Sequence, residues 1–213
     1  LREVADDPER QQNVFRKMLR FVSFISFPAM LGLAFVAKEL IVISVSGRWL
    51  PCVPVMQLMC VWGAVMPISN LYTHVLLSHG KSNIYLYNTV ALGIAQLVML
   101  VGLLSLGVYY MVLAFVVVNL AWLFVWHYFV AKQIRIRLVD VFKDIIPFLL
   151  LSLISLCICF ISTLFLAVNN IYMLFMLKLL IVSALYIAML YFSGAVIFKE
   201  VLSFLRKRQV SRL

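Results

Sequence analysis

Six apolar segments joined by short polar connections make up most of this chain, and each is long enough to cross a membrane as a helix. They lie at residues 21–45, 52–77, 84–106, 108–131, 145–168 and 171–192. A hydrocarbon core of about 30 Å takes roughly 20 apolar residues in helical form. Helices also satisfy their own backbone amides, as a bilayer requires. We therefore predict an all-α polytopic membrane helix bundle with about six transmembrane helices.

The composition excludes a soluble domain. Of the 213 residues, 65% are hydrophobic and 12% are charged, whereas soluble domains have about 45–50% apolar and about 25% charged residues. The net charge of +10 could suggest nucleic acid, but such a module gathers its basic residues on one soluble face. Here the basic residues lie between the apolar segments, so no nucleic-acid partner is expected.

Lysine and arginine fall unevenly on the two sides of the predicted bundle. One side carries Arg2, Arg10, Arg16, Lys17, Arg20, Lys81, Lys132, Arg135, Arg137, Lys143, Lys199, Arg206, Lys207, Arg208 and Arg212. The connections on the opposite side carry only Arg48. Because basic residues concentrate on the cytoplasmic side of membrane proteins, both termini of this chain are predicted to be cytoplasmic.

The expected organisation has three parts. Residues 1–20 form a cytoplasmic helical entry segment, residues 21–193 the six-helix transmembrane bundle, and residues 194–213 a cytoplasmic amphipathic basic tail. Asp7-Pro8-Glu9 has the pattern of a helix N-cap, a first-position proline and a first-turn acid, so a helix is predicted to start at Pro8 and continue into the first span. The sequence does not begin with methionine, and we expect it to be part of a longer chain.

Two prolines near mid-membrane predict weak points in the first two spans. Pro28 has no amide hydrogen for the carbonyl of Phe24 and is expected to interrupt the first span, as is the Lys38-Glu39 pair. Pro67 leaves the carbonyl of Gly63 free in the same way. Pro28, Gly63 and Pro67 are therefore hinge candidates, although membrane helices also tolerate proline without moving.

Polar side chains on the second, third and fourth spans are candidates for a substrate cavity. Asn70, His74 and Ser78 follow one another at intervals of four residues and share one helix face. Asn88 and Asn119 lie on the next two spans. A polar stripe of this kind is expected to face water or protein. The alternative for each residue is a hydrogen bond that joins two helices.

Lys178 is the candidate site residue with the most specific physical argument, because it is a charged side chain inside an apolar span. It lies about two turns inside the sixth span, where a bare ammonium costs roughly 2.5–3.5 kcal/mol. Lys38 and Glu39 are expected to neutralise each other near the outer end of the first span, and no carboxylate is expected in the middle of a span as a partner for Lys178. Three readings stay open: a partner outside this sequence, a visiting anionic substrate, or snorkelling towards the outer surface.

Enzyme and metal chemistry find no support in the sequence. It contains no nucleophile elbow, zinc-protease motif or phosphate-binding glycine loop. Asp140 and Asp144 fall in the basic connection at 132–144, where general acid–base work is not expected. We therefore expect no enzyme, no cofactor and no metal site, and we interpret the four cysteines as small apolar residues.

A series of short motifs in the first part of the chain is familiar in its order and spacing. It comprises Asp7-Pro8-Glu9-Arg10, Phe27-Pro28, Leu31-Gly32, Ala37-Lys38-Glu39-Leu40-Ile41, Gly47-x-Trp49, Pro54-Val55 and Leu76-Leu77-x-x-Gly80-Lys81-Ser82. This order resembles the polysaccharide or O-antigen flippases of the Wzx type, which are lipopolysaccharide biosynthesis proteins of the multidrug/oligosaccharidyl-lipid/polysaccharide exporter superfamily. The resemblance covers about residues 1–131.

The resemblance implies a function. Such proteins are two-lobed bundles in the bacterial inner membrane that flip undecaprenyl-diphosphate-linked oligosaccharides by alternating access. This chain would be the C-terminal lobe, and its partners would be the lipid-linked oligosaccharide, membrane lipids and an N-terminal lobe outside this sequence. Lys178 and the Asn70, His74 and Asn119 set are then available to bind a diphosphate and a glycan. The alternatives are a multidrug/cation antiporter, expected to have an acidic cavity residue, and a non-transporting scaffold subunit.

Overall fold

The computed structural model describes residues 8–165 and 170–193, and throughout these residues the chain is helical with short connections. The elements are α1 (Pro8–Phe35), α2 (Ala37–Ser44), η2 (Gly47–Cys52), α3 (Val53–Ser78), α4 (Ser82–Gly102), η3 (Leu104–Leu106), α5 (Val108–Ile134), α6 (Leu138–Phe165) and α7 (Ile171–Ser193). Within the described ranges, 6 helices are long and apolar enough to cross a membrane. The all-α polytopic fold class is confirmed.

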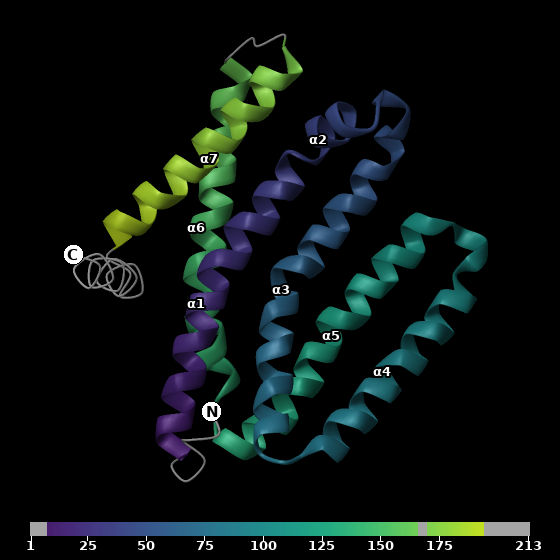
Figure 1. Ribbon diagram of the computed structural model, residues 1–213, viewed down its shortest axis with the longest axis vertical. Coiled ribbons are helices and arrows are strands. Elements are labelled where there is room, and N and C mark those ends of the chain that lie inside the picture. The colour runs from purple at the N-terminus through teal and green to yellow at the C-terminus, as the bar shows by residue number, and fades with distance from the viewer. Residues whose placement is uncertain (1–7, 166–169, 194–213) are drawn as a thin grey trace, which may run out of the picture.

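Helix α1 occupies the middle of the bundle. It packs against α3 on one side and α6 on the other, while α5 packs against α3 and α7 against α6. Figure 1 shows α7 at one edge and the α4–α5 hairpin at the other, with α4 outermost. Because the connections are short, consecutive long helices run antiparallel.

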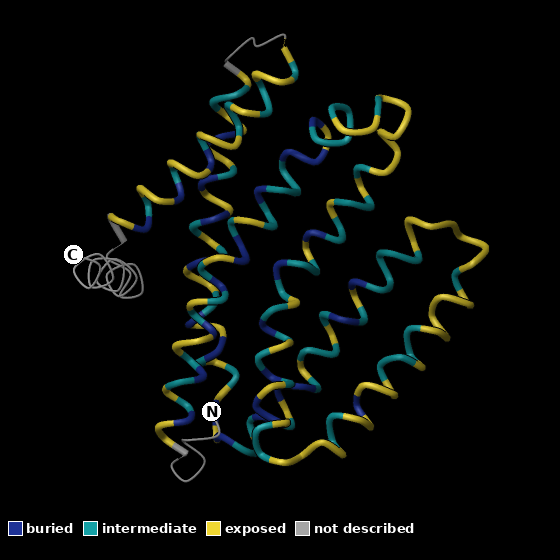
Figure 2. Tube along the Cα trace, in the orientation of Figure 1, coloured by how far each residue is buried: buried dark blue, intermediate teal, exposed yellow. Residues whose placement is uncertain are grey.

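The core lies where α1, α3, α5 and α6 meet. Its largest fully buried side chains include Tyr72, Phe15, Leu19 and Ile68. Figure 2 shows buried positions along these helices and far fewer along α4, where Asn88 is the buried residue. Since lipid is as apolar as leucine, close packing and hydrogen bonds hold such helices together. The exposed apolar side chains of α4 suit contact with lipid or with further protein.

The start of α1 confirms one prediction and its course corrects another. The helix begins at Pro8 with Glu9 in its first turn, and it runs on into the first span; Asp7 lies outside the described residues. The helix also continues through Pro28, so the expected interruption at Pro28 is wrong. The break falls at Val36, between α1 and α2, next to the Lys38-Glu39 pair that was also expected to interrupt this span.

Two connections are closed by local backbone chemistry. At the end of α3, Gly80 has a φ of +69°, and the amides of Gly80 and Lys81 donate to the carbonyls of Leu77 and Leu76. This is a Schellman motif, which explains a glycine at that position. At the start of α7, the side chain of Asn170 accepts a hydrogen bond from the amide of Tyr172 at 3.0 Å and caps the helix.

The connection expected at residues 132–144 is much shorter in the structure. Helix α5 extends to Ile134 and α6 begins at Leu138, so residues 135–137 make the turn, with Arg135 at a φ of 53°. Ile134, Ile136 and Val141 are buried there, because the two helix ends pack into the bundle. The expectation that Asp140 and Asp144 lie in a loop is therefore wrong.

The three-part division remains a prediction. Residues 8–20 belong to the same continuous helix as the first span. The basic tail at 194–213 lies outside the described residues.

Candidate functional site

A buried ion pair joins α7 to α2. The Nζ atom of Lys178 lies 2.6 Å from Oε1 of Glu39, and the two side chains are 13% and 7% exposed. The ammonium also lies 4.9 Å from the centre of the Phe35 ring, within the range of a cation–π contact. None of the three possibilities given for Lys178 included this partner, which lies within the sequence, near the outer end of the first span.

The break in the first span explains this pairing. Because the helix stops at Phe35 and restarts at Ala37, α2 turns Glu39 into the bundle and leaves Lys38 exposed. The expected mutual neutralisation of Lys38 and Glu39 is accordingly wrong, since the carboxylate of Glu39 is held by Lys178. Oε2 of Glu39 is buried without a hydrogen-bond partner.

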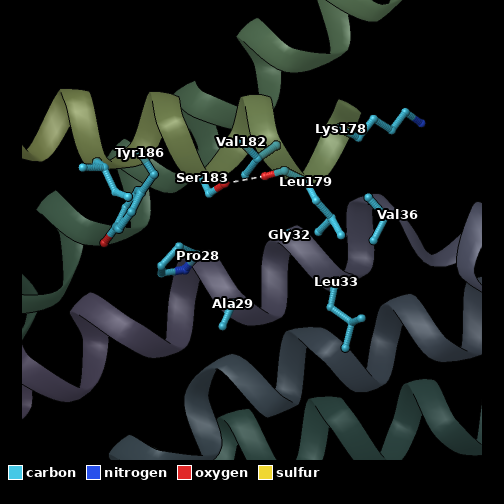
Figure 3. A pocket seen from close by; sticks show the side chains of 11 residues that line it. Pro28, Ala29, Gly32, Leu33, Val36, Lys178, Leu179, Val182, Ser183 and Tyr186 are labelled. Atoms are coloured by element: carbon cyan, nitrogen blue, oxygen red, sulfur yellow. Dashed lines mark hydrogen bonds between the residues drawn. The ribbon is translucent and has the colours of Figure 1, made fainter. Parts of the chain in front are cut away.

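A groove of about 360 Å³ runs between α1 and α7. Its lining is formed by Pro28, Ala29, Gly32, Leu33, Val36, Lys178, Leu179, Val182, Ser183, Tyr186 and Ile187. Figure 3 shows the two helices facing each other across it, with Lys178 at one end and Tyr186 at the other. The walls are almost entirely apolar, and Lys178 is the charged residue among them; its side chain extends away from the other lining residues (Figure 3), and its ammonium contacts Glu39.

Tyr186 occupies the weak point created by Pro28. Its hydroxyl donates a hydrogen bond of 2.8 Å to the carbonyl of Phe24, the carbonyl that Pro28 leaves without a helical donor. The Tyr186 side chain is buried. The hinge candidate on α1 is therefore tied to α7 by a side-chain hydrogen bond.

The hinge candidates on α3 are held in a similar way by α1. The hydroxyl of Ser26 donates to the carbonyl of Ala64 at 2.8 Å and approaches that of Gly63 at 3.4 Å, the carbonyl released by Pro67. A Cβ at Gly63 would come within 3.2 Å of Sδ of Met30, so this glycine permits close approach of α1 and α3. Helix α3 is continuous through both Gly63 and Pro67.

The predicted polar stripe on α3 lies on an open face in this chain. Asn70 and His74 are exposed. Ser78 is half-buried and donates to the carbonyl of Val75 at 2.8 Å. An asparagine and a histidine exposed within a membrane span require water or another protein surface beside them.

Asn88 and Asn119 are placed differently. Both are buried, and each donates to the carbonyl four residues earlier, that of Ile84 for Asn88 and that of Phe115 for Asn119. Asn119 also accepts a hydrogen bond of 3.2 Å from Gln96, which joins α4 to α5. This geometry matches the helix-joining alternative for Asn119, whereas the bond of Asn88 stays within α4. The structure thus does not bring Asn88 and Asn119 together with Lys178 or with the exposed stripe.

A second charged cluster ties α1 to the first turns of α6. Arg16 donates to the carboxylate of Asp144 through Nε at 2.6 Å and through Nη2 at 3.1 Å. Nε of Arg20 lies 3.2 Å from the same carboxylate, whose side chain is 7% exposed. This contact was not predicted; the spacing of four between Arg16 and Arg20 was the available signal in the sequence, since it puts both on one helix face.

Tyr72 and His127 form a further polar contact that was not predicted from the sequence. The Tyr72 hydroxyl lies 3.2 Å from Nδ1 of His127, and both residues are buried. They line an apolar cavity of about 390 Å³ between α1, α3, α5 and α6. Tyr72 was not a candidate because an aromatic residue in an apolar segment carries no sequence signal of its polar partner.

Fold and site together define a polytopic membrane helix bundle with a charge pair buried between helices. Its charged and hydrogen-bonding side chains can join neighbouring helices, and the exposed ones can bind a polar ligand. Within residues 8–165 and 170–193, no group of three or more histidine, cysteine, aspartate or glutamate side chains could hold a metal ion.

Comparison with known proteins relates the chain to polysaccharide biosynthesis. Residues 1–54 match the family model described as "Polysaccharide biosynthesis protein". The chain is 37% identical over 81 residues to the "Uncharacterized membrane protein in cps region" of Klebsiella pneumoniae. It is 32% identical over 82 residues to the "Lipopolysaccharide biosynthesis protein WzxC" of Escherichia coli (strain K12). No solved structure matches the chain.

These matches cover a limited part of each protein. Each one involves 38% of this chain, and the chain spans 17% of the length of each curated relative. The predicted resemblance to Wzx-type polysaccharide flippases is confirmed by the family model and by the name of the second relative.

Proposed function

We propose that this chain is part of a transporter that flips undecaprenyl-diphosphate-linked oligosaccharide units across a membrane during polysaccharide or lipopolysaccharide biosynthesis. The observation that carries the proposal is the similarity of its N-terminal part to a polysaccharide biosynthesis family and to a lipopolysaccharide biosynthesis protein. The six-span helical fold supports transport rather than an enzymatic step, because flipping requires a path through the membrane and makes no covalent bond.

Among the residues that the structure describes, three side chains are the candidates for contact with such a substrate. A glycan offers hydroxyl and amide groups, which Asn70 and His74 on the open face of α3 could bind by hydrogen bonds. A diphosphate needs cations, and Lys178 is the ammonium in the groove lining. Because Glu39 already holds Lys178, binding of a phosphate there would require Glu39 to release it.

The setting of the transporter is part of the same proposal. We place the chain in a bacterial inner membrane with both termini cytoplasmic, because basic residues concentrate on the side of the termini. The remaining partners are membrane lipids and an N-terminal lobe. The open face of α3 is then the surface that faces this lobe or the substrate path.

A multidrug/cation antiporter of the same superfamily is the second candidate, and one observation favours it. Such an antiporter was expected to show an acidic residue in its cavity, and Glu39 is a buried carboxylate beside the groove. For Glu39 to bind a cation, however, Lys178 would first have to leave. The flippase remains the better-supported function.

The test is export of surface polysaccharide in a flippase-null strain that expresses the full protein. We expect Lys178→Ala and Pro67→Ala to lower export while the amount of protein in the membrane is preserved. Lys38→Ala is the matched control, since Lys38 is an exposed lysine, and it should leave export unchanged.

The outcomes separate the candidates. Normal export in both variants would remove these residues from the transport site. Failure of the unaltered protein to restore export, together with drug efflux by the same cells, would favour the antiporter. Failure in both assays would favour the scaffold alternative.

A further inference from the structure

The ion pair between Glu39 and Lys178 joins a long helix to a short one. Helix α7 is a span of 23 residues, whereas α2 has 8 residues and follows the break at Val36. We propose that this ion pair is a latch that holds α2 against α7, and that α2 swings about Val36 when the latch opens.

The backbone around Val36 is suited to act as the joint. The amide of Val36 still donates to the carbonyl of Gly32 at 3.2 Å, and its carbonyl accepts from the amide of Leu40 at 2.9 Å. The hydrogen bonding of α1 and α2 thus meets at one residue, so α2 can change direction without unwinding α1. A helix of this length has little stability of its own, and its position depends on the contacts it makes.

The ion pair is short but incompletely satisfied. Nζ of Lys178 and Oε1 of Glu39 lie 2.6 Å apart, while Oε2 of Glu39 is buried without a hydrogen-bond partner. A buried ion pair loses hydration on both sides, and a partly satisfied one regains it on opening. The closed and open states are therefore closer in free energy than for a fully hydrogen-bonded pair, as a switch requires.

The latch lies at one end of the groove between α1 and α7. Val36 and Lys178 both line the groove between α1 and α7, and Val36 is 1% exposed. When α2 swings about Val36, we expect the packing around this residue to loosen so that Val36 becomes accessible, and the ammonium of Lys178 loses its carboxylate. The inference concerns the motion of α2 and does not depend on which molecule the protein transports.

The test measures access to the joint in the full protein in native membranes. Val36→Cys is introduced after every native cysteine of the full protein is replaced by alanine, including Cys52, Cys60, Cys157 and Cys159 of this chain, and labelling by a water-soluble maleimide is followed over time. We expect slow labelling with the ion pair intact and labelling several-fold faster with Glu39→Gln or Lys178→Met. The exchanged pair Glu39→Lys with Lys178→Glu should return the rate towards the slow value.

Lys38→Gln is the matched control, because Lys38 neighbours Glu39 on α2 and is exposed; it should label as slowly as the parent. The latch is refuted if Glu39→Gln leaves the labelling rate unchanged, or if the exchanged pair labels as fast as the single variants. Circular dichroism of each purified variant checks that helical content is kept. Fast labelling with lost helicity in Glu39→Gln would also overturn the proposal, since the pair would then support folding rather than the position of α2.

Discussion

The hydroxyl of Tyr186 on α7 donates a hydrogen bond of 2.8 Å to the backbone carbonyl of Phe24 on α1, 162 residues away in the chain. Pro28 releases that carbonyl because proline has no amide hydrogen. A position that looks like a free hinge in the sequence is thus an attachment point between helices. Movement at Pro28 must therefore involve α7 as well as α1.

Tyr186→Phe removes this donor and nothing else from the side chain. We expect it to lower the free energy of unfolding by about 1 kcal/mol, because a buried carbonyl loses its partner. Unfolding of the purified protein in detergent by denaturant measures the change. Tyr87→Phe is the control, since Tyr87 is 75% exposed on α4 and its change should be negligible.

Pro28→Ala tests the same contact from the other side. Alanine restores an amide that can donate to the carbonyl of Phe24, so the Tyr186 hydroxyl should matter less. In a double-mutant cycle, the cost of Tyr186→Phe is expected to fall by at least half in the Pro28→Ala background. Equal costs in the two backgrounds would mean that the hydroxyl of Tyr186 acts through a partner other than the carbonyl of Phe24.

Asp144→Asn should weaken the contact between α1 and α6. It leaves Arg16 and Arg20 without the carboxylate they share, at an expected cost of about 2 kcal/mol, below that of a fully buried pair because both arginines are partly exposed. Thermal unfolding of the purified protein measures it. Asp140→Asn, one turn earlier on α6, should cost clearly less; a similar cost would argue for a general charge effect.

Alanine substitutions of Asn119 and Asn70 should affect different properties of the protein. Asn119→Ala removes the hydrogen bond to Gln96 and should cost about 1 kcal/mol of stability. Asn70→Ala, on an exposed position, should change stability by less than about 0.5 kcal/mol yet lower polysaccharide export. Parallel unfolding and export assays decide this, and unchanged export with Asn70→Ala would place that residue outside the substrate path.

Much of the fold could be predicted because its signals are local. The start of α1 at Pro8, the turn at Gly80 and the lengths of the spans depend on hydropathy and on the backbone preferences of proline and glycine. The interruption predicted at Pro28 does not occur, because a helix can continue through a proline when neighbouring groups satisfy the carbonyl that the proline leaves free. The hydroxyl of Tyr186 is such a neighbour, and nothing near Pro28 in the sequence announces it.

The candidate site could be predicted only in part. Lys178 stood out because a lysine inside an apolar span is costly wherever the span packs. Its partner Glu39 was missed, since adjacent Lys38 seemed to neutralise it and the break at Val36 was not foreseen at that residue. Asp144 was missed as a buried residue because α6 begins at Leu138, earlier than hydropathy indicated, so about two helical turns were interpreted as a loop.

The sequence by itself determined the number of spans, their helical form and the positions where charge within the membrane needs an explanation, because these follow from each residue and its near neighbours. Only the tertiary structure decided which charges meet. Lys178 and Glu39 are 139 residues apart, and Arg16 and Asp144 are 128 apart. Such pairs depend on which faces of distant helices pack together, and that is a property of the whole bundle.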